Sequence, residues 1–170
     1  MKNLNKIVPF ALILLLSGGL SAHNNSKSIS VPIYLMQKQG EPKHLGHVTI
    51  METPKGLLFT PSLKMLRKGE HGFHIHEKPS CENHGMAAGP HFDPKNTKTH
   101  LGPYKNGHLG DLPRLIVNAS SKIGAVVAPR LKTIEEIKNH ALMIHEGGDN
   151  YSDHPENGGG GGRMACGVIK

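Results

Sequence analysis

Histidine is concentrated in one part of this chain. The window from residue 71 to residue 111 holds seven of the thirteen histidines in 170 residues. Within it, His74 and His76 are separated by a single isoleucine. Because successive side chains of a β-strand point to opposite faces, two residues spaced in this way emerge on the same face. Imidazole is the commonest metal ligand in proteins, so the alternation predicts a strand that binds a metal ion on one face.

Further candidate ligands follow in a segment that is rich in turn residues. His91, His100, His108 and Asp111 alternate with glycines and prolines between residues 89 and 113. This composition is typical of an ordered loop rather than a strand or a helix. A spacing of three residues lets one tight turn direct His108 and Asp111 at one ion, although a plain turn role is the alternative for Asp111. We therefore expect the loop to fold back over the strand and to supply ligands.

Short apolar alternations separated by Gly, Pro, Asn and Ser predict an all-β protein. The expected strands cover residues 29–36, 48–50, 56–60, 72–76, 114–118, 122–127, 140–145 and 163–169. No βαβ rhythm is present, so these eight strands favour an antiparallel sandwich or barrel. A helix of a couple of turns at most is expected after Thr133, which has capping-box spacing to Glu136. Pro32 in the first strand indicates a sheet edge or a bulge.

The first 22 residues have the order of a secretory signal peptide. Lys2 and Lys6 precede an apolar run over residues 7–16, and small residues follow up to Ala22. The run is too short to span a bilayer, and it lacks the amphipathic pattern of a buried N-terminal helix, which is the alternative. We expect cleavage near Ala22. The mature chain would be one domain, residues 23–170, without a membrane anchor.

A moderate excess of positive charge remains after the signal segment is removed. The mature chain would carry 18 Lys and Arg against 13 Asp and Glu, a net charge of +5. This excess suits the steering of a small anionic substrate, but it also suits a role in solubility alone. The chain has no tryptophan, only seven phenylalanines and tyrosines, and no basic run among them. It is therefore not expected to bind nucleic acid by base stacking.

The chain contains two cysteines, Cys81 and Cys166. An even count in an exported chain predicts one intramolecular disulfide, which would tie the ligand loop to the last strand. On the chain-entropy account, a loop of this length stabilises the fold by about 4 to 5 kcal/mol. Two free thiols acting as soft metal ligands are the alternative, and an oxidising compartment disfavours them.

A second group of reactive side chains lies near the C-terminus. The apolar run 141–144 ends at His145, and a glycine turn that contains Asp149 follows. Arg163 comes after the glycine tract 158–162, which we expect to be a loop, and stands three residues before Cys166. An arginine fixed beside a metal site can hold a small anion, because its guanidinium is permanently charged and offers several donors. A surface salt bridge for Arg163 and a turn role for Asp149 are the alternatives.

Six blocks of the chain together resemble one known family. They are HGFHIH (71–76), GPHF (89–92), HLGP (100–103), GHLGDLP (107–113), HEGGDNYSD (145–153) and RMACGVI (163–169). In this order they closely resemble copper/zinc superoxide dismutase of the bacterial periplasmic type, over essentially the whole mature chain. The resemblance implies an eight-stranded Greek-key β-barrel with long metal-binding and glycine-rich loops. It also implies a periplasmic location.

The resemblance assigns one copper and one zinc ion to each chain. Copper would be bound by His74, His76, His91 and His145. Zinc would be bound by His91, His100, His108 and Asp111, so that His91, as an imidazolate, bridges the two ions. An all-imidazole site suits a copper ion that cycles between two oxidation states. Zinc has no redox chemistry, so its closed site would be structural and electrostatic.

The resemblance also assigns roles around the metals. Asp149 would link His74 to His100 by hydrogen bonds, and Cys81 would pair with Cys166. The implied reaction is the dismutation of superoxide to O2 and H2O2, which protects the cell envelope. In it, His91 detaches from copper and delivers a proton, while Arg163 holds the anion.

Proteins with other functions would use the same residues differently. A periplasmic copper- and zinc-holding protein would bind both ions without turnover. A β-sandwich adhesion module would use a purely structural metal ion, so that loss of a ligand would lower only stability. A zinc hydrolase would need a general base, and no carboxylate stands out near an open zinc position. The sequence also leaves a homodimer open.

Several histidines and one loop depart from the ligand pattern. His71 matches a family position that is not a ligand, so we expect it to pack or to form hydrogen bonds. The histidines that match no ligand position are His23, His44, His47, His84, His140 and His154. Residues 82–90 are shorter than the charged insertion that bacterial relatives carry there for steering and dimer contact. We hypothesise that four lysines near the site replace it in steering: Lys78, Lys95, Lys98 and Lys105.

Overall fold

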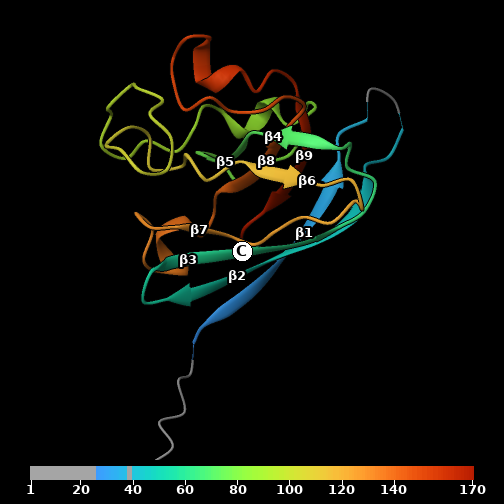
Figure 1. Ribbon diagram of the computed structural model, residues 1–170, viewed down its shortest axis with the longest axis horizontal. Coiled ribbons are helices and arrows are strands. Elements are labelled where there is room, and N and C mark those ends of the chain that lie inside the picture. The colour runs from blue at the N-terminus through green and yellow to red at the C-terminus, as the bar shows by residue number, and fades with distance from the viewer. Residues whose placement is uncertain (1–25, 38–39) are drawn as a thin grey trace, which may run out of the picture.

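The structure is a computed structural model that describes residues 26–37 and 40–170. Over these residues it contains nine β-strands and three short 3-10 helices (Figure 1). The strands are β1 Ser28–Leu35, β2 Lys43–Thr53, β3 Gly56–Leu63, β4 Gly69–His71, β5 Phe73–His76, β6 Leu115–Val117, β7 Val126–Ala128, β8 Ala141–His145 and β9 Arg163–Val168. The 3-10 helices are η1 Met86–Ala88, η2 Ile134–Ile137 and η3 Glu156–Gly159. The predicted signal segment, 1–22, and its cleavage point near Ala22 lie outside the described residues.

Seven of the strands form one antiparallel sheet. Their order is β5-β8-β9-β1-β2-β3-β7, and β4 pairs with β6 in a second, two-stranded sheet. Neighbours that are distant in the sequence, such as β9 and β1, are typical of Greek-key sandwiches and barrels. Figure 1 shows β4 and β6 facing β2 and β3 across the apolar core. The predicted all-β class is confirmed.

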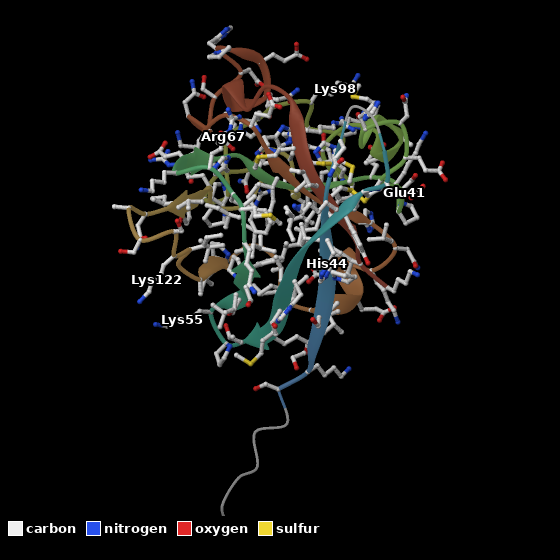
Figure 2. All side chains as sticks on the ribbon, turned by 90° about the vertical axis from the view of Figure 1, so that its right-hand side faces the viewer. Glu41, His44, Lys55, Arg67, Lys98 and Lys122 are labelled. Atoms are coloured by element: carbon white, nitrogen blue, oxygen red, sulfur yellow. A yellow bond between two sulfur atoms is a disulfide. The ribbon has the colours of Figure 1, made fainter. Side chains whose placement is uncertain are left out.

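The core is built by alternation along the strands. On β1, Val31 and Ile33 are buried, and on β2, Val48 and Ile50 are buried. The intervening residues face outward. His44 of β2, for example, is exposed on the outer side of the sheet (Figure 2). The bulge that Pro32 suggested lies next to it, as a shift of register between Ile33 and Tyr34.

Strand β5 is buried on both of its faces. Phe73 and Ile75 point into the core, where the Phe73 ring meets the Phe59 ring edge-on with centroids 5.6 Å apart. The alternate residues, His74 and His76, are 0% and 1% exposed and contact the long loops instead. One strand therefore carries an apolar face and a histidine face.

The strand predicted over residues 72–76 corresponds to β5, and an unpredicted strand, β4, ends just before Gly72. Before this residue, β4 pairs with β6, whereas β5 after it pairs with β8. The Gly72 N–H donates to the carbonyl of Gly147 at 2.7 Å, and its carbonyl accepts from the His145 N–H at 2.8 Å. The backbone of Gly72 is thus tied to the end of β8. β4 is the strand that raises the number from the eight predicted to the nine of the described chain.

Two other predicted elements differ in length. The strand expected at 122–127 is reduced to β7, because the Asn118 side chain accepts hydrogen bonds from the backbone N–H groups of Ser120 and Lys122 and forms a turn. The helix expected after Thr133 is the single 3-10 turn η2, and its capping box with Glu136 is present. None of the helices in the described part of the chain is long and apolar enough to cross a membrane.

Two long loops meet on one side of the molecule. The loop after β5, yellow-green in Figure 1, and the loop after β8, red, both lie on the side away from β2 and β3. The predicted disulfide is present: Cys81 and Cys166 are bonded, with Cα atoms 5.7 Å apart. It joins the first of these loops to β9, so the loop that carries most candidate ligands is covalently attached to the sheet.

Candidate metal centre

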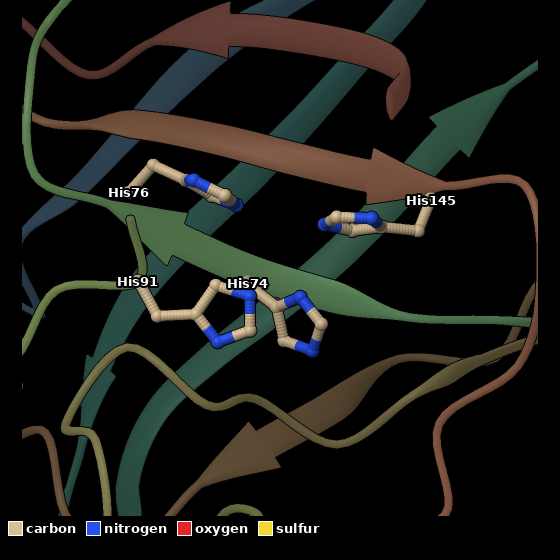
Figure 3. A group of neighbouring side chains, drawn as sticks. All are labelled: His74, His76, His91 and His145. Atoms are coloured by element: carbon tan, nitrogen blue, oxygen red, sulfur yellow. The ribbon is translucent and has the colours of Figure 1, made fainter. Parts of the chain in front are cut away.

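The first group of candidate ligands is assembled by β5, β8 and one loop residue. His74 and His76 project from β5, His145 ends β8, and His91 lies opposite His76 in an isolated β-bridge. One ligand atom from each of the four lies within 4.8 Å of the others. In Figure 3 the rings of His76 and His145 point toward each other across the site. The structure thus brings together the four residues that the sequence assigned to copper, whose copper binding stays a prediction.

The loop is held against β5 by backbone hydrogen bonds. The N–H of Phe92 donates to the carbonyl of Ile75, and the N–H of Ile75 donates to the carbonyl of Gly110, each at 2.8 Å. Gly110 is required at this contact, because a Cβ atom there would lie 2.3 Å from the Ile75 carbonyl oxygen. The edge of β5 is therefore covered by the loop, which places His91 and Asp111 beside the histidine face.

We call the first group copper-side and the second group, around Asp111, zinc-side. In the copper-side rings of His74, His76 and His145, one nitrogen faces a hydrogen-bond acceptor and the other has no hydrogen-bond partner. Nε2 of His74 donates to Asp149 Oδ2 at 2.7 Å, and Nδ1 of His76 donates to the Gly89 carbonyl at 2.8 Å. Nδ1 of His145 lies 3.3 Å from the Gly161 carbonyl. The opposite nitrogens of these three rings are buried without a hydrogen-bond partner. Such a pattern fixes the tautomer and leaves the other lone pair for a metal ion.

The second group surrounds Asp111. Its Oδ1 lies 3.1 Å from Nδ1 of His91, 3.0 Å from Nδ1 of His100 and 3.4 Å from Nδ1 of His108. Ligand atoms at zinc-bond length from one tetrahedral ion are about 3.3 Å apart. The distances from Asp111 to the three histidines that the sequence assigned to zinc are thus close to this value, although the zinc binding of the four residues stays a prediction. The His91 ring belongs to both groups.

Asp149 connects the two groups by hydrogen bonds to one histidine of each. Its Oδ2 accepts from His74 and its Oδ1 accepts from His100 Nε2 at 2.8 Å. The residue is 3% exposed. Gly158 closes over it, since a Cβ at that position would lie 2.0 Å from Oδ1. The structure therefore contains the link between His74 and His100 that the sequence resemblance implied for Asp149.

Burial keeps the copper-side histidines neutral. It is the largest cause that lowers the pKa of His74 and His76, and the neighbouring His91 lowers both further. Burial and His91 also lower the pKa of His145, to about 4. At neutral pH these rings therefore offer lone pairs rather than protons, as metal ligands must.

The carboxylates of the site are held ionised. Burial alone would raise the pKa of Asp111 and of Asp149, but hydrogen bonds, with His100 first for each, bring both pKa values well below the usual range. Burial would lower the pKa of His100, but its hydrogen bonds with Asp111 and Asp149 raise it to about 9. The ionised carboxylate of Asp111 thus supplies the zinc-side group with negative charge that suits a divalent cation.

A cavity of about 340 Å³ opens beside the copper-side group. It is lined by His76, His91, His145 and Arg163, together with loop residues. The Arg163 guanidinium is held at its wall by hydrogen bonds to the carbonyls of Gly85 at 2.5 Å and Gly89 at 2.6 Å. Both carbonyls belong to the short segment 82–90, so the reduced loop still fixes the arginine. A fixed positive charge at the mouth of the cavity can hold a small anion.

The remaining histidines lie outside the ligand groups. His71 is buried, with its ring nitrogens 2.8 Å from the His145 carbonyl and 2.9 Å from the Arg67 carbonyl, which fits the expected hydrogen-bonding role. His140 packs against Phe92 with ring centroids 4.1 Å apart. In the described part of the chain no candidate metal group includes His44, His47, His84, His140 or His154. His23 lies outside the described residues.

Sequence reasoning missed three residues that support the site. Arg130 donates to the carbonyls of His108 at 2.9 Å and Gly107 at 2.7 Å. Arg114 donates to the carbonyl of Asp149, and the Tyr151 N–H donates to its carboxylate. For the two arginines no local motif signals the contact, because each partner is more than twenty residues away in the sequence. Tyr151 lies in a recognised block, but only its backbone reaches the carboxylate.

Comparison with known proteins places the chain in a family. The family described as copper/zinc superoxide dismutase (SODC) matches residues 44–169. The superoxide dismutase [Cu-Zn] of Escherichia coli (strain K12) is 54% identical over 153 residues, which cover 84% of this chain and 88% of that protein. The solved Cu/Zn superoxide dismutase from Brucella abortus is 52% identical with a TM-score of 0.79, covering 85% of this chain and all of the other. The solution structure of the monomeric copper, zinc superoxide dismutase from Salmonella enterica is 53% identical with a TM-score of 0.72 and the same coverage. This chain therefore belongs to the copper/zinc superoxide dismutase family.

Proposed function

We propose that this protein is an enzyme that dismutates superoxide, converting two superoxide anions and two protons into O2 and H2O2. The observation that carries the proposal is the position of His91, whose ring belongs both to an all-imidazole group and to a group of three histidines and one aspartate. A shared ring of this kind fits a paired copper and zinc centre. Membership of the family supports the same activity.

The side chains present fit the two metals. Three ring nitrogens on the copper side are buried without a hydrogen-bond partner: His74 Nδ1, His76 Nε2 and His145 Nε2. On the zinc side, Nδ1 of His100 and Nδ1 of His108 converge on Asp111 Oδ1, at 3.0 and 3.4 Å. Buried polar atoms are normally satisfied, so their convergence supports bound ions. Copper would be held by His74, His76, His91 and His145, and zinc by His91, His100, His108 and Asp111. When bound, copper supplies one-electron redox chemistry, while zinc supplies a fixed charge without redox chemistry.

Arg163 binds the substrate in this proposal. Its guanidinium is positioned by two backbone carbonyls and lines the same cavity as His76, His91 and His145. Because these hydrogen bonds fix the charge in advance, little reorganisation is needed when the anion arrives. Arg163 thus orients superoxide beside the copper-side histidines in both halves of the reaction.

His91 moves a proton. Its Nδ1 lies 3.1 Å from Asp111 Oδ1, so its other ring nitrogen, Nε2, is the one available to the copper-side group. We assign to Nε2 the uptake of one proton from solvent and its transfer to the reduced oxygen species, and the second proton also comes from solvent through the cavity. The zinc-side group, to which Nδ1 belongs, would hold the ring on that side during this transfer, so the proton-carrying nitrogen stays directed at the substrate.

Export to the periplasm completes the proposal. Residues 1–22 would be the cleaved signal peptide and residues 23–170 the mature enzyme. Support comes from the order of charged, apolar and small residues in the sequence. The Cys81–Cys166 disulfide supports it as well, because disulfides persist in oxidising compartments. In that location the enzyme would protect the cell envelope from superoxide.

The oligomeric state is a separate question. The sequence leaves a homodimer open, and the relative from Salmonella enterica is described as monomeric. The monomer of this chain already contains every candidate ligand of both groups. We therefore expect the dismutase activity per chain to be independent of protein concentration. A dilution series of the enzyme would test this.

The proposed function is tested by metal analysis and activity on one sample. The mature protein is loaded with copper and zinc, and its metal content and rate of superoxide disproportionation are measured. We expect one copper and one zinc per chain together with activity. The Arg163→Ala variant should keep both metals but lose at least about tenfold in rate, because the fixed charge on the anion is removed.

The alternative outcomes are distinct. A protein that binds both ions and shows no rate above that of the metal-free sample would be a metal-holding protein, and the proposal would be wrong. If the Arg163→Ala variant has the wild-type rate, the arginine does not bind the substrate. The proposed dismutase activity would still stand.

A further inference from the structure

We propose that Arg114 and Tyr151 form a clamp that holds Asp149 and thereby slows the loss of zinc. The proposal rests on the function proposed above, because it takes Asp149 to connect a copper ligand with a zinc ligand. Neither clamp residue belongs to a candidate ligand group. Both are positioning residues that act through Asp149.

Asp149 can orient the two rings only if it is itself fixed. Its two oxygens accept from His74 at 2.7 Å and from His100 at 2.8 Å. Rotation of the carboxylate would break at least one of these hydrogen bonds. Groups that orient metal ligands in this way control metal affinity nearly as strongly as the ligands do. The contacts that hold Asp149 are therefore expected to control zinc retention.

Tyr151 holds the carboxylate end of Asp149. Its backbone N–H donates to Asp149 Oδ1 at 2.7 Å. Tyr151 has a φ of 59°, a left-handed backbone conformation that residues other than glycine rarely adopt. The Tyr151 side chain packs against Gly102, where a Cβ atom would lie 2.5 Å from Tyr151 Cγ. Gly102 in turn donates its N–H to Asp111 Oδ2 at 3.2 Å. The ring thus packs between the Asp149 turn and the loop that carries the zinc-side ligands.

Arg114 holds the backbone end of Asp149. Its Nη1 donates to the Asp149 carbonyl at 2.8 Å, and its own backbone N–H donates to the Tyr151 hydroxyl at 3.1 Å. The guanidinium carbon stands 5.3 Å from the centroid of the Tyr151 ring, within range of a cation–π contact. An ion pair with Glu70 at 3.2 Å is partly exposed, so it adds little.

The three residues contact one another in a closed circuit. Arg114 binds Asp149, Asp149 binds Tyr151, and Tyr151 binds Arg114. Release of zinc requires His100 to turn away from Asp111, and His100 is held by the Asp149 carboxylate. With the clamp intact, that movement must break contacts on both sides of Asp149. Without it, the Asp149 turn can move together with His100.

The test is the rate of zinc release from the mature, zinc-loaded protein into an excess of a chromogenic chelator. We expect Arg114→Ala and Tyr151→Ala each to release zinc about 10- to 100-fold faster than the wild type. Tyr151→Phe keeps the ring on Gly102 and loses only the hydroxyl, so its increase should be smaller. Because the residues act as one unit, the double variant Arg114→Ala/Tyr151→Ala should be about as fast as the faster single variant.

Matched controls separate the clamp from general destabilisation. Tyr34→Ala removes a tyrosine from β1, and Lys122→Ala removes an exposed positive charge, and both should release zinc at the wild-type rate. Cobalt(II) bound in place of zinc provides a second measurement. The clamp variants should change its visible absorption spectrum, whereas a purely structural role would lower only the unfolding midpoint of the metal-free protein.

The outcomes distinguish this proposal from the proposed function. If the wild type retains zinc and dismutates superoxide while the clamp variants release zinc at the wild-type rate, the clamp is wrong and the function stands. If the wild type dismutates superoxide but binds no zinc, the clamp is wrong and the enzyme activity stands. If it binds no zinc and shows no activity, both are wrong. Should Tyr151→Ala not fold, Arg114→Ala and Tyr151→Phe decide the matter, and wild-type rates in both would overturn the clamp.

Discussion

A neutral histidine can serve a metal ion with only one ring nitrogen, and hydrogen bonds outside the ligand groups decide which one. His74 gives Nε2 to Asp149 and keeps Nδ1 free, whereas His76 gives Nδ1 to the Gly89 carbonyl and keeps Nε2 free. Because the accepting oxygen fixes the proton, it also directs the opposite lone pair at the site. The binding properties of each histidine thus depend on residues that touch no metal.

Substitution of single ligands should separate the two metals. His145 belongs only to the copper-side group and His108 only to the zinc-side group. After loading with both ions, we expect His145→Ala to keep zinc and to lose copper and dismutase activity. His108→Ala should lose zinc and retain copper. Metal analysis of the two purified variants against the wild type checks this directly.

The opposite result has a clear meaning. If His145→Ala lowers the unfolding midpoint but leaves copper content and activity unchanged, the metal has only a structural role, as in an adhesion module. If both variants lose both ions to the same degree, the two groups are not separate sites.

The identity of the site residues was largely accessible from the sequence, but their support was not. His74 and His76 could be paired by strand periodicity alone, and His91, His100, His108 and Asp111 were candidates from loop composition. Their division between two ions came from family resemblance, because spacing does not show which loop residue reaches which ion. The roles of Arg114 and Arg130 depend on contacts between distant segments, which leave no local pattern.

At the scale of elements, the site depends on a loop that packs directly on the backbone of β5. The loop replaces a neighbouring strand, since Ile75 exchanges backbone hydrogen bonds with Phe92 and Gly110. This arrangement demands a glycine at position 110, where the chains are too close for a side chain. The ligand geometry is therefore set by backbone contacts as much as by the ligands.

Replacement of Gly110 should be costly. A Cβ atom in Gly110→Ala would lie 2.3 Å from the Ile75 carbonyl oxygen, and neither backbone can move without breaking hydrogen bonds. We expect the free energy of unfolding to fall by about 2 to 4 kcal/mol, in the range of overpacked or strained sites. Gly124→Ala is the matched control, because a Cβ there meets nothing within 4 Å. Urea unfolding of both variants provides the measurement, and equal stabilities would contradict the packing argument.

The type of an element was predictable where its hydrophobic periodicity was strong. The predicted ends of strands were wrong where tertiary contacts determine them. β1, β8 and β9 lie close to their predicted positions because their apolar residues alternate or run continuously. β4 was not predicted, because it consists of only three residues and forms by pairing with β6, which is distant in the sequence. β2 extends well beyond the predicted 48–50, since it has partners β1 and β3 on both sides.

For the whole molecule, the burial of so many histidines couples stability to pH. In the unfolded chain a histidine titrates near pH 6.5. In the folded metal-free protein burial lowers the pKa of His74, His76 and His145, to about 4 for His145. The stability from these groups is therefore complete above pH 6.5 and is lost as the pH falls toward 4. His100 acts in the opposite sense: its pKa is raised to about 9, so its contribution is complete below pH 6.5 and is lost as the pH rises through 9.

The metal-free protein should thus be less stable at pH 5.5 than at pH 7.5. Each histidine that stays neutral when folded lowers the stability by about 1.4 kcal/mol in total between pH 7.5 and pH 5.5, and three such residues outweigh His100. Urea unfolding at the two pH values measures the difference. Equal stability, or greater stability at pH 5.5, would show that these histidines are not held neutral.

The positive charge of the molecule should guide the substrate. Lys78, Lys95, Lys98 and Lys105 are all exposed on the segment between residues 78 and 105 that carries His91 and His100. Figure 2 shows Lys98 on the loop-bearing side and Lys55 and Lys122 toward the other end. Replacing the four lysines with Ser should lower the dismutation rate severalfold at low ionic strength and weaken its dependence on salt. The Lys55→Ser/Lys122→Ser control should match the wild type, and an unchanged rate and salt dependence in the fourfold variant would show that these lysines do not steer.

The central claim is that the His91 ring binds both metals, and the most direct measurement is the electron paramagnetic resonance spectrum of the protein with Cu(II) at both sites. Two Cu(II) ions joined by one imidazolate are magnetically coupled. We therefore predict a low-temperature signal that integrates to far fewer than two spins per chain, with metal analysis showing both sites filled. Two independent Cu(II) signals that together integrate to two spins per chain would contradict the account.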